Sequence, residues 1–496
     1  MYTLSAYYIY IHPFLPILPP PTSIECHDMV ISISPASFTD GLVNRHSLPH
    51  WPTSSLTLAI SSILVLIPLP QGSHFPHSSI PLKQSLAHLF AEEAFDEVDN
   101  EIDRITRASS HASGVFNEQI SFNGLSRLYP ILALAILSVY EYCQRGSISR
   151  MRGRANQAVT AAMDLSLHVL GHTSTEAERR TWWSAVSSVR VLGTRSFAYL
   201  FFKMLVLYLS SIDYQTPWSL LLEAEQSLIS VPQTFNGPHE NFSTSVSSSD
   251  SSERIMQFDS YLSTQIKSSI YLPRLTSKES PDVIASQNLR SISTLFIHCA
   301  RIRLHRARAF MEIPMFLERF CDLAAIVDER GTNAALSSLR SHNLDSFFPF
   351  TEEESSLICL KSALTISRGF ETLSLTRPSP GHSPSMDVGK ALMGDGMGGF
   401  LLPFFACSAM QSSYVLLMCY YRLRAALVSG DLATCYCLLN RPEADSEVQD
   451  VERLMREIQQ GLESILGAMR GARMFEGVSD MSKEIHIACQ SAIFGS

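Results

Sequence analysis

Apolar residues recur at helical spacing over most of the chain from residue 81 onward, and no domain shows the alternation of half-buried strands. Residues 128–142, with the sequence LYPILALAILSVYEY, are apolar nearly all round, which is typical of a helix surrounded by other helices. The run is too short to cross a bilayer. We therefore predict a buried helix here.

Two amphipathic helices are predicted next. The pattern over residues 149–170 places small and apolar side chains at steps of three and four, so that one face is apolar and allows close helix approach. These are Met151, Ala155, Ala158, Val159, Ala162, Met163, Ser166 and Val169. A third helix begins near residue 176, where Thr173 with Glu176, or Thr175 with Glu178, forms a capping box.

Four more stretches have helical patterns. An acidic helix over 81–107 has an apolar side, and its carboxylates favour a solvated face over a metal or acid–base site. A stripe over 289–302, a nearly continuous apolar run over 401–427 and the amphipathic stretch 448–469 indicate further helices packed into a core. The predicted fold class is all-α. The chain is expected to form a large multi-helix domain, either as one unit or as two helical lobes, with flexible linkers.

The helical patterns and the composition shifts between them predict the domain organisation. Residues 1–80 are expected to be an irregular N-terminal segment, since its apolar runs at 1–18 and 56–69 are broken by prolines or too short to span a membrane. A Ser-rich linker at 234–255 and a Pro/Gly-rich linker at 376–399 separate three helical parts, 81–233, 256–375 and 400–496. Two alternatives stay open: residues 1–80 arise from a misassigned reading frame, and about 187–204 from an insertion such as a translated intron.

Composition restricts the partners. The 496-residue chain has a formal net charge of −9 and only 17% charged residues, which argues against a basic nucleic-acid surface spread over the whole chain. Ten cysteines lie among apolar residues without paired spacing, as buried thiols do, so we expect no disulfide framework.

Catalytic and cofactor motifs are weak or missing. A G-x-G-x-x-G pattern at Gly394, Gly396 and Gly399 lies in the second linker with no preceding strand, so we interpret it as linker and not as a dinucleotide site. A phosphate-binding loop, a zinc-protease helix and a nucleophile elbow are all absent. We therefore expect no enzyme activity, no catalytic residue, no cofactor and no bound metal.

The order of the central segments resembles a known family. A helix ending in YEY, a helix ending in MDLSLHVLG and then an ERRTWW helix are similar to the regulatory middle region of fungal zinc-cluster transcription factors, with gaps, over roughly residues 82–488. The segments HRARAF at 305–310 and the apolar run 401–427 extend the resemblance. It is carried by Tyr140, Glu141, Tyr142, Ala155, Ala162, Met163, Leu165, Leu167, His168, Glu178, Arg179, Arg180, Trp182, Trp183, His305, Arg306 and Arg308.

The resemblance implies a regulator of RNA polymerase II transcription in the nucleus, acting through the transcription machinery, co-regulator proteins or a small effector. The family's DNA-binding device, six cysteines in two C-x2-C-x6-C halves that hold two zinc ions, is missing from this sequence. Zinc therefore remains a property of the family alone, and DNA contact is expected to be weak or indirect. No membrane partner is expected.

Two groups of motif residues are candidates for a site. Arg179 and Arg180 beside Trp182 and Trp183 suit either a ligand pocket or, as we favour, inward packing with ion pairs. The basic cluster over 298–308 suits either phosphate contact or neutralisation of a helix end. We expect Trp183 to be structural, at the junction of the three central helices. The rival functions are a helical scaffold without a DNA role and an all-helical enzyme with a hydrophobic cavity.

Overall fold

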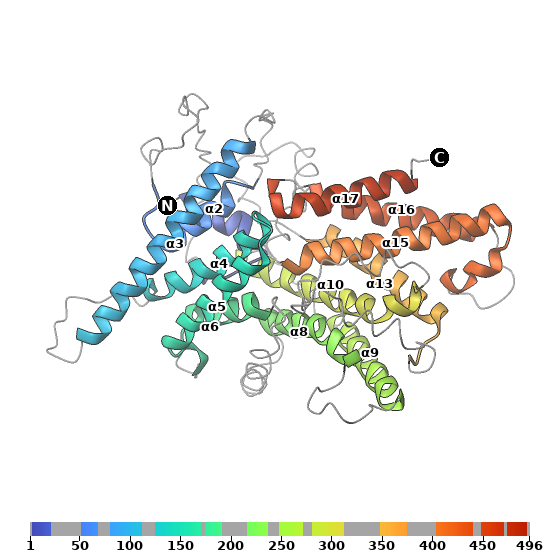
Figure 1. The fold of residues 1–496 in the computed structure, drawn as a ribbon, viewed down its shortest axis with the longest axis horizontal. Helices are drawn as coiled ribbons and strands as arrows, with labels where there is room; N and C mark the ends of the chain where they lie inside the picture. Colours follow the sequence, from blue (N-terminus) through green and yellow to red (C-terminus); the bar gives the residue numbers. More distant parts are fainter. Residues whose placement is uncertain are drawn as a thin grey trace.

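The computed structural model describes residues 2–20, 51–67, 80–111, 125–169, 174–190, 216–236, 248–270, 280–311, 348–373, 403–439, 448–470 and 474–493. Thirteen α-helices and no strand occur in these ranges, which confirms the predicted all-α class. Within them, no helix combines the length and the apolar character that crossing a membrane requires. Figure 1 shows the N-terminal helices α2 to α6 gathered at one end, α15 to α17 at the other, and α8 and α10 between them.

The buried centre of the N-terminal end is α4 (Tyr129–Cys143), where every residue from Pro130 to Cys143 is buried. It packs against α2 (Ser55–Leu64), α3 (Ile80–His111), α5 (Ile148–Asp164) and α6 (Glu176–Arg190). A helix enclosed on all sides has no polar face to offer water, which explains its uniform apolar sequence. The prediction of a buried helix is confirmed.

The alanine-lined helix is shorter than predicted. α5 ends at Asp164, and Ser166 takes a left-handed backbone conformation with φ of 57° before the short helix η6 (Leu167–Val169). The predicted face is correct as far as Ala162, but Met163 is 37% exposed and Val169 is 71% exposed. The turn at Ser166 breaks the helical register, so that Leu167 is buried instead.

The capping box at the start of α6 is the one built from Thr175 and Glu178. The Glu178 amide donates to Thr175 Oγ1 at 3.2 Å, and the Thr175 amide donates to Glu178 Oε2 at 2.8 Å. These bonds satisfy two main-chain N–H groups at the helix start. The alternative residue, Thr173, lies outside the described residues.

The N-terminal segment expected to be irregular contributes to the core. Residues 2–20 form α1 (Tyr2–Ala6), a π-helical turn η1 (Tyr7–Ile11) and an extended tail, and residues 51–67 contain α2. Phe14 is 1% exposed and Ile60 is fully buried. The expectation of an irregular segment over 1–80 is therefore wrong for these two stretches, because apolar side chains of distant helices cover them.

The Ser-rich linker is also partly helical. α8 (Pro217–Asn236) enters it, and α9 (Ser248–Ile270) begins inside it, because Ile255 and Leu262 are buried against neighbouring helices. The second linker lies outside the described residues. Of the suspected insertion, residues 187–190 continue α6, and the remainder lies outside them as well.

The other predicted helices occur where the apolar periodicity placed them. They are α3, α10 (Pro281–Ala309), α15 (Pro403–Ser429) and α16 (Val448–Arg470). The sequence pattern did not single out α13 (Glu352–Thr372), the 3₁₀ segment η9 (Leu432–Leu439) or α17 (Glu476–Ile493), which also occur. The predicted stripe of α10 is buried throughout, from Leu289 to Ile302. One contiguous hydrophobic core extends from Tyr7 to Cys489 across the described residues.

Candidate functional site

The motif residues of α6 divide between the start of the helix and its buried face. Glu178 closes the capping box and pairs with Arg127. Arg179 donates to the main-chain carbonyl of Ser174 at 2.7 Å and lies 3.6 Å from Glu176. Both side chains therefore stabilise the helix start.

Arg180 is buried and joins α6 to α10. Its two terminal nitrogens lie 2.9 and 2.8 Å from the two carboxylate oxygens of Asp282, and its Nε donates to Glu176 at 2.8 Å. This two-point contact matches the planar shape of guanidinium and carboxylate. The bonds from His12 and Arg180 hold the pKa of Asp282 well below its usual range, although burial acts in the opposite direction.

Trp182 and Trp183 are each 4% exposed. The Trp183 ring lies 6.1 Å from the ring of Trp218 in α8, and Trp182 lies 6.3 Å from the ring of His168. Neither indole lines the two cavities described below. The arrangement is one of packing between helices, with α8 as a partner that the sequence pattern did not indicate.

The basic cluster of α10 contacts other elements instead of forming an open surface. Arg301 pairs with Asp259 of α9 at 2.7 and 3.0 Å, and Arg308 donates to the Phe350 carbonyl at 3.3 Å. Arg303 is only 6% exposed, and Arg306 is half-buried. The end of α10 is bound by Arg422 of α15, which donates to the Ala309 carbonyl at 2.9 Å.

His305 lies in an arrangement that resembles a catalytic triad. Its Nε2 is 3.2 Å from Asp259 and its Nδ1 is 3.3 Å from the hydroxyl of Ser355. The bonds to His305 and Arg301 lower the pKa of Asp259 to about 2, against the effect of its burial. His305 and Ser355 are both 0% exposed and line neither of the two cavities described below, so we assign this group to packing between α9, α10 and α13.

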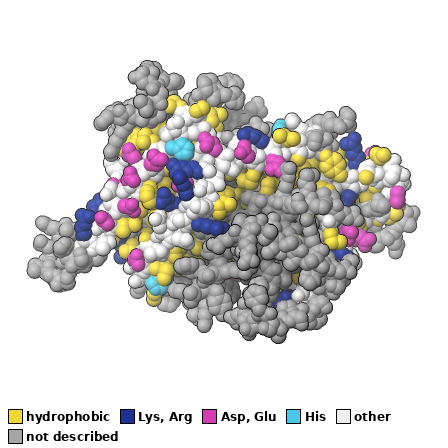
Figure 2. Space-filling view, viewed as in Figure 1, with side chains coloured by type: hydrophobic (Ala, Val, Ile, Leu, Met, Phe, Trp, Pro, Cys, Tyr) yellow, Lys and Arg dark blue, Asp and Glu magenta, His cyan; other side chains and the backbone are white. Residues whose placement is uncertain are grey.

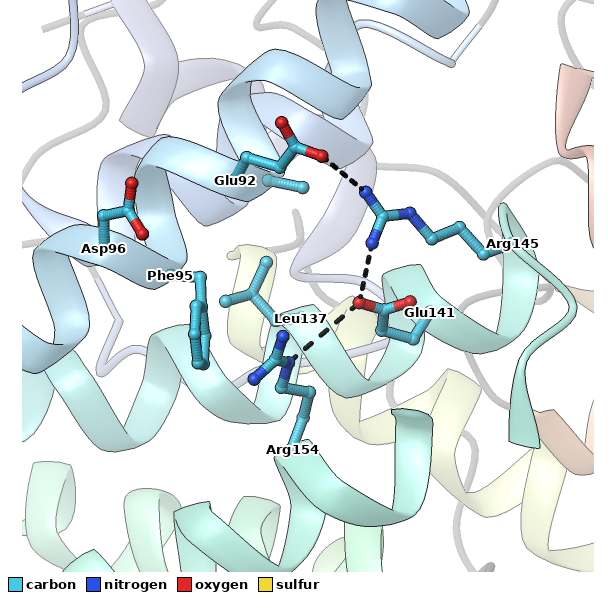
Figure 3. A pocket seen from close by; sticks show the side chains of 8 residues that line it. Glu92, Phe95, Asp96, Leu137, Glu141, Arg145 and Arg154 are labelled. Carbon is cyan, nitrogen blue, oxygen red and sulfur yellow. Dashed lines mark hydrogen bonds and ion pairs between the residues drawn. The ribbon is translucent and has the colours of Figure 1, made fainter. Parts of the chain in front are cut away.

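A small cavity of about 90 Å³ lies between α3, α4 and α5. Figure 3 shows Glu92 and Asp96 of α3 on one side and Glu141 at the end of α4 on the other. Arg145 bridges them, with one terminal nitrogen 3.2 Å from Glu92 and the other 3.1 Å from Glu141. The cavity therefore lies between the YEY segment of α4 and the acidic helix α3, and Arg145 links the two.

Arg154 of α5 completes the wall of this cavity. Its guanidinium carbon lies 3.5 Å from the centre of the Phe95 ring, which is a close cation–π contact. Its polar contacts are long, 4.0 Å to Glu141 and 3.4 Å to Gln157. Burial lowers the pKa of Arg154 below its usual value.

The chemistry of the cavity suits a small polar ligand. Three carboxylates and two guanidinium groups line it together with Phe95 and Leu137. A volume of 90 Å³ equals roughly three water molecules at ~30 Å³ each, so a ligand would have only a few heavy atoms. A dipolar molecule would meet a charge of each sign, with Arg154 facing its negative end.

A wider hollow of about 430 Å³ lies between α13, η9 and α16. Its floor is apolar, with Leu360, Leu364 and Leu438 all buried. Arg368 and Glu457 form an ion pair between α13 and α16 at its edge. The charged side chains at the edge join the two helices over this apolar floor.

No metal site emerges among the described residues, which contain no group of three or more His, Cys, Asp or Glu side chains placed to hold an ion.

Cys435 and Cys437 lie in η9 with free thiols. Cys407, however, is disulfide-bonded. The bond at Cys407 is an exception to the expected buried thiols, and the other seven cysteines of the described residues are free. The glycines 394, 396 and 399 lie outside the described residues.

Sequence reasoning missed most of the residues that build these sites. Arg145, Arg154, Asp282 and His12 belong to no recognisable motif, and Asp259 lies just beyond the predicted linker. Their partners are separated by up to 270 residues, as for His12 and Asp282. A charge that pairs across such a distance leaves no local signal in the sequence.

Comparison of the chain with known protein families, curated proteins and solved structures finds no match. Of the resemblance suggested by the central segments, only its coarsest part, a largely all-helical protein, is established by the structure.

Proposed function

We propose that this chain is a transcription regulator of the kind that the regulatory region of fungal zinc-cluster factors represents, acting in the nucleus on RNA polymerase II transcription. The observation that carries the proposal is the packing of the segments behind the resemblance. α4, α5 and α6 contact one another directly, and Arg180 links α6 to α10. Motif residues from 140 to 308 thus belong to one connected unit.

The cavity between α3, α4 and α5 supports regulation by a small effector. Glu141 belongs to the YEY segment that carries the resemblance, and it meets Arg145 and Arg154 at this cavity. An effector held there would contact three helices at once. Such contact shifts an equilibrium between helix arrangements by as much as the effector prefers one of them.

Action through protein partners agrees with the charge distribution. On the part of the face that Figure 2 describes, basic and acidic side chains alternate and no continuous basic surface is visible. In α10, Arg301 pairs with Asp259, Arg308 donates to the Phe350 carbonyl and Arg303 is buried. DNA contact would therefore be weak or supplied by a partner, such as a co-regulator or a chain that carries its own DNA-binding module.

A reporter assay tests the proposal. The full chain is fused to an unrelated DNA-binding module and placed upstream of a reporter gene in fungal cells, and the module alone is the control. We expect the fusion to change reporter transcription several-fold, and Arg154→Leu, which removes a charge from the cavity, to reduce that change. Arg107→Leu is the matched control, since Arg107 is exposed, lies outside the cavity lining and pairs with Asp103 of the same helix.

The rival function of a scaffold predicts a different result. A scaffold without a DNA role would leave transcription unchanged although the fusion is folded and reaches the nucleus. That outcome would contradict the proposal. Equal reporter activity of the Arg154→Leu variant and the parent would leave regulation through protein partners but remove the cavity from it.

A further inference from the structure

Residues 7–19, which comprise η1 and the segment after it, form a loop with hydrogen bonds of its own. The hydroxyl of Tyr7 donates to the Leu15 carbonyl at 2.9 Å and accepts from the amides of Ile17 at 3.0 Å and Leu18 at 3.2 Å. Tyr8 closes the far end by donating to the Pro19 carbonyl at 2.6 Å. One buried phenol thus ties both ends of the loop, and burial raises the pKa of Tyr7 far above its usual value.

The loop buries a row of large side chains in the rest of the molecule. Tyr7, Ile11, Phe14 and Ile17 are each no more than 1% exposed. After η1 the chain turns, with the Leu15 amide donating to the Ile11 carbonyl at 2.9 Å, and prolines at positions 13, 16 and 19 remove three main-chain donors. The remaining carbonyls need partners from elsewhere.

Side chains of α6 and α10 bind those carbonyls. Arg180 donates from Nη1 to the Leu18 carbonyl at 2.8 Å and lies 3.5 Å from that of Pro16. Asn288 donates from Nδ2 to the Pro13 carbonyl at 3.0 Å. The carbonyls of Pro13, Pro16 and Leu18 lie outside any helix, and side chains from α6 and α10 supply the donors they need, as the donors of a binding groove would for a bound peptide.

A histidine completes the contact. His12 Nε2 lies 3.1 Å from Asp282, the same carboxylate that Arg180 holds at two points. Arg180 also keeps its bond to Glu176. Arg180 binds both Asp282 and Glu176 without the loop. These three charged side chains would therefore stay paired if the loop left the groove.

We propose that α6 and α10 form a peptide-binding groove and that residues 7–19 of this chain occupy it as an exchangeable intramolecular ligand. The groove recognises a segment with buried aromatic and aliphatic residues, a histidine and prolines that expose main-chain carbonyls. This goes beyond the proposed function and does not depend on it, since the contacts would be the same in a protein with any activity.

The test uses the full chain with a specific protease site introduced within residues 21–50. Cleavage leaves the N-terminal piece bound without a covalent link. A fluorescent synthetic peptide of residues 2–20 is then added, and its exchange is followed by anisotropy. We expect reversible, saturable binding, weakened about tenfold or more by Asn288→Ala and by Arg180→Gln. Arg179→Gln is the matched control, because Arg179 binds Ser174 and Glu176 and not the loop.

A peptide variant guards against loss of folding in the protein variants. Tyr7→Phe in the peptide removes only the hydroxyl that ties the loop, so it should bind the unchanged cleaved protein about tenfold or more weakly. The proposal is overturned if the cleaved piece leaves only when the whole protein unfolds, or if Tyr7→Phe, Asn288→Ala and Arg180→Gln all leave the affinity unchanged. Exchange between two copies instead of with the peptide would appear as a dimer in light scattering, and would support the same groove.

Discussion

At the scale of single residues, His298 shows how burial sets a charge state. It is 7% exposed, and burial together with the nearby charge of Arg301 lowers its pKa to about 4 from the usual 6.5. The imidazole is therefore neutral at physiological pH. A neutral histidine in the folded chain and a titrating one in the unfolded chain make the free energy of unfolding depend on pH.

The sign of this dependence follows from proton binding. Between pH 6.5 and 4 the unfolded state binds more protons at His298 than the folded state, so the free energy of unfolding falls as the pH falls through this window. The loss reaches about 3 kcal/mol at most. Urea unfolding of His298→Gln should depend less steeply on pH between 7 and 4.5 than that of the parent. His486→Gln in α17 is the control, and equal slopes for parent and His298→Gln would contradict the assignment.

Gly477 marks a close approach between two parts of the backbone. Its amide donates to the Gln144 carbonyl at 3.1 Å, where α17 meets the turn after α4. A Cβ atom at this position would lie 2.5 Å from the Gly146 nitrogen and 2.6 Å from the Tyr142 oxygen. Both are main-chain atoms, which cannot move aside as a flexible side chain can.

Gly477→Ala should therefore destabilise the protein by about 1–3 kcal/mol, as overpacking of a tight contact does. Gly153→Ala provides the opposite case, because nothing lies within 4 Å of a Cβ atom there and the position is inside α5. That substitution should stabilise the protein by about 0.5–1 kcal/mol through helix propensity. Thermal unfolding of both variants decides: equal melting temperatures would refute the close approach.

At the scale of elements, α6 connects the central helices to α8. Trp183 is 4% exposed and faces Trp218 of α8. Ser187 strengthens the same interface by donating to Glu225 of α8 at 2.7 Å. α6 also packs on α4 and α5, so the indole lies near the junction of four helices.

Trp183→Ala should cost about 3–5 kcal/mol, the usual loss for a buried tryptophan, and lower the melting temperature of the full chain. The full chain is the right object, because residues 2–20 bind Arg180 of the same helix. Trp183→Phe should lose less, since an aromatic ring remains against Trp218. A Trp183→Ala variant that melts like the parent but no longer binds an effector or partner would favour the ligand-pocket interpretation.

At the scale of the whole molecule, charge argues against specific DNA recognition by this chain alone. The net charge is −9, and Arg301 and Arg308 of α10 bind other parts of the protein. We expect at most a weak complex with DNA. Its affinity should fall steeply as the salt concentration rises from about 50 to about 200 mM, because phosphate contacts depend on counterion release. A mobility-shift assay with random and genomic DNA measures this, and a salt-resistant complex with one sequence would disprove it.

The candidate site was predictable only in part, and the reason differs between residues. The α6 capping box could be found because Thr175 and Glu178 are three residues apart and bind within one turn. The cavity could not, because Glu92, Glu141 and Arg154 come from three helices and meet only after packing. The basic stretch of α10 was visible, but its partners Asp259 and Phe350 were not.

The sequence by itself determined the helices with a long apolar period, because that period and the caps act over a few neighbouring residues. α4, α10 and α15 form where the pattern placed them. Tertiary structure alone decided which surfaces are buried and which charges pair. It drew the N-terminal run into the core, ended α5 at a left-handed Ser166 and joined Arg180 to Asp282. Such contacts link residues that are far apart in the chain, so their free energy depends on the whole packing and not on any local pattern.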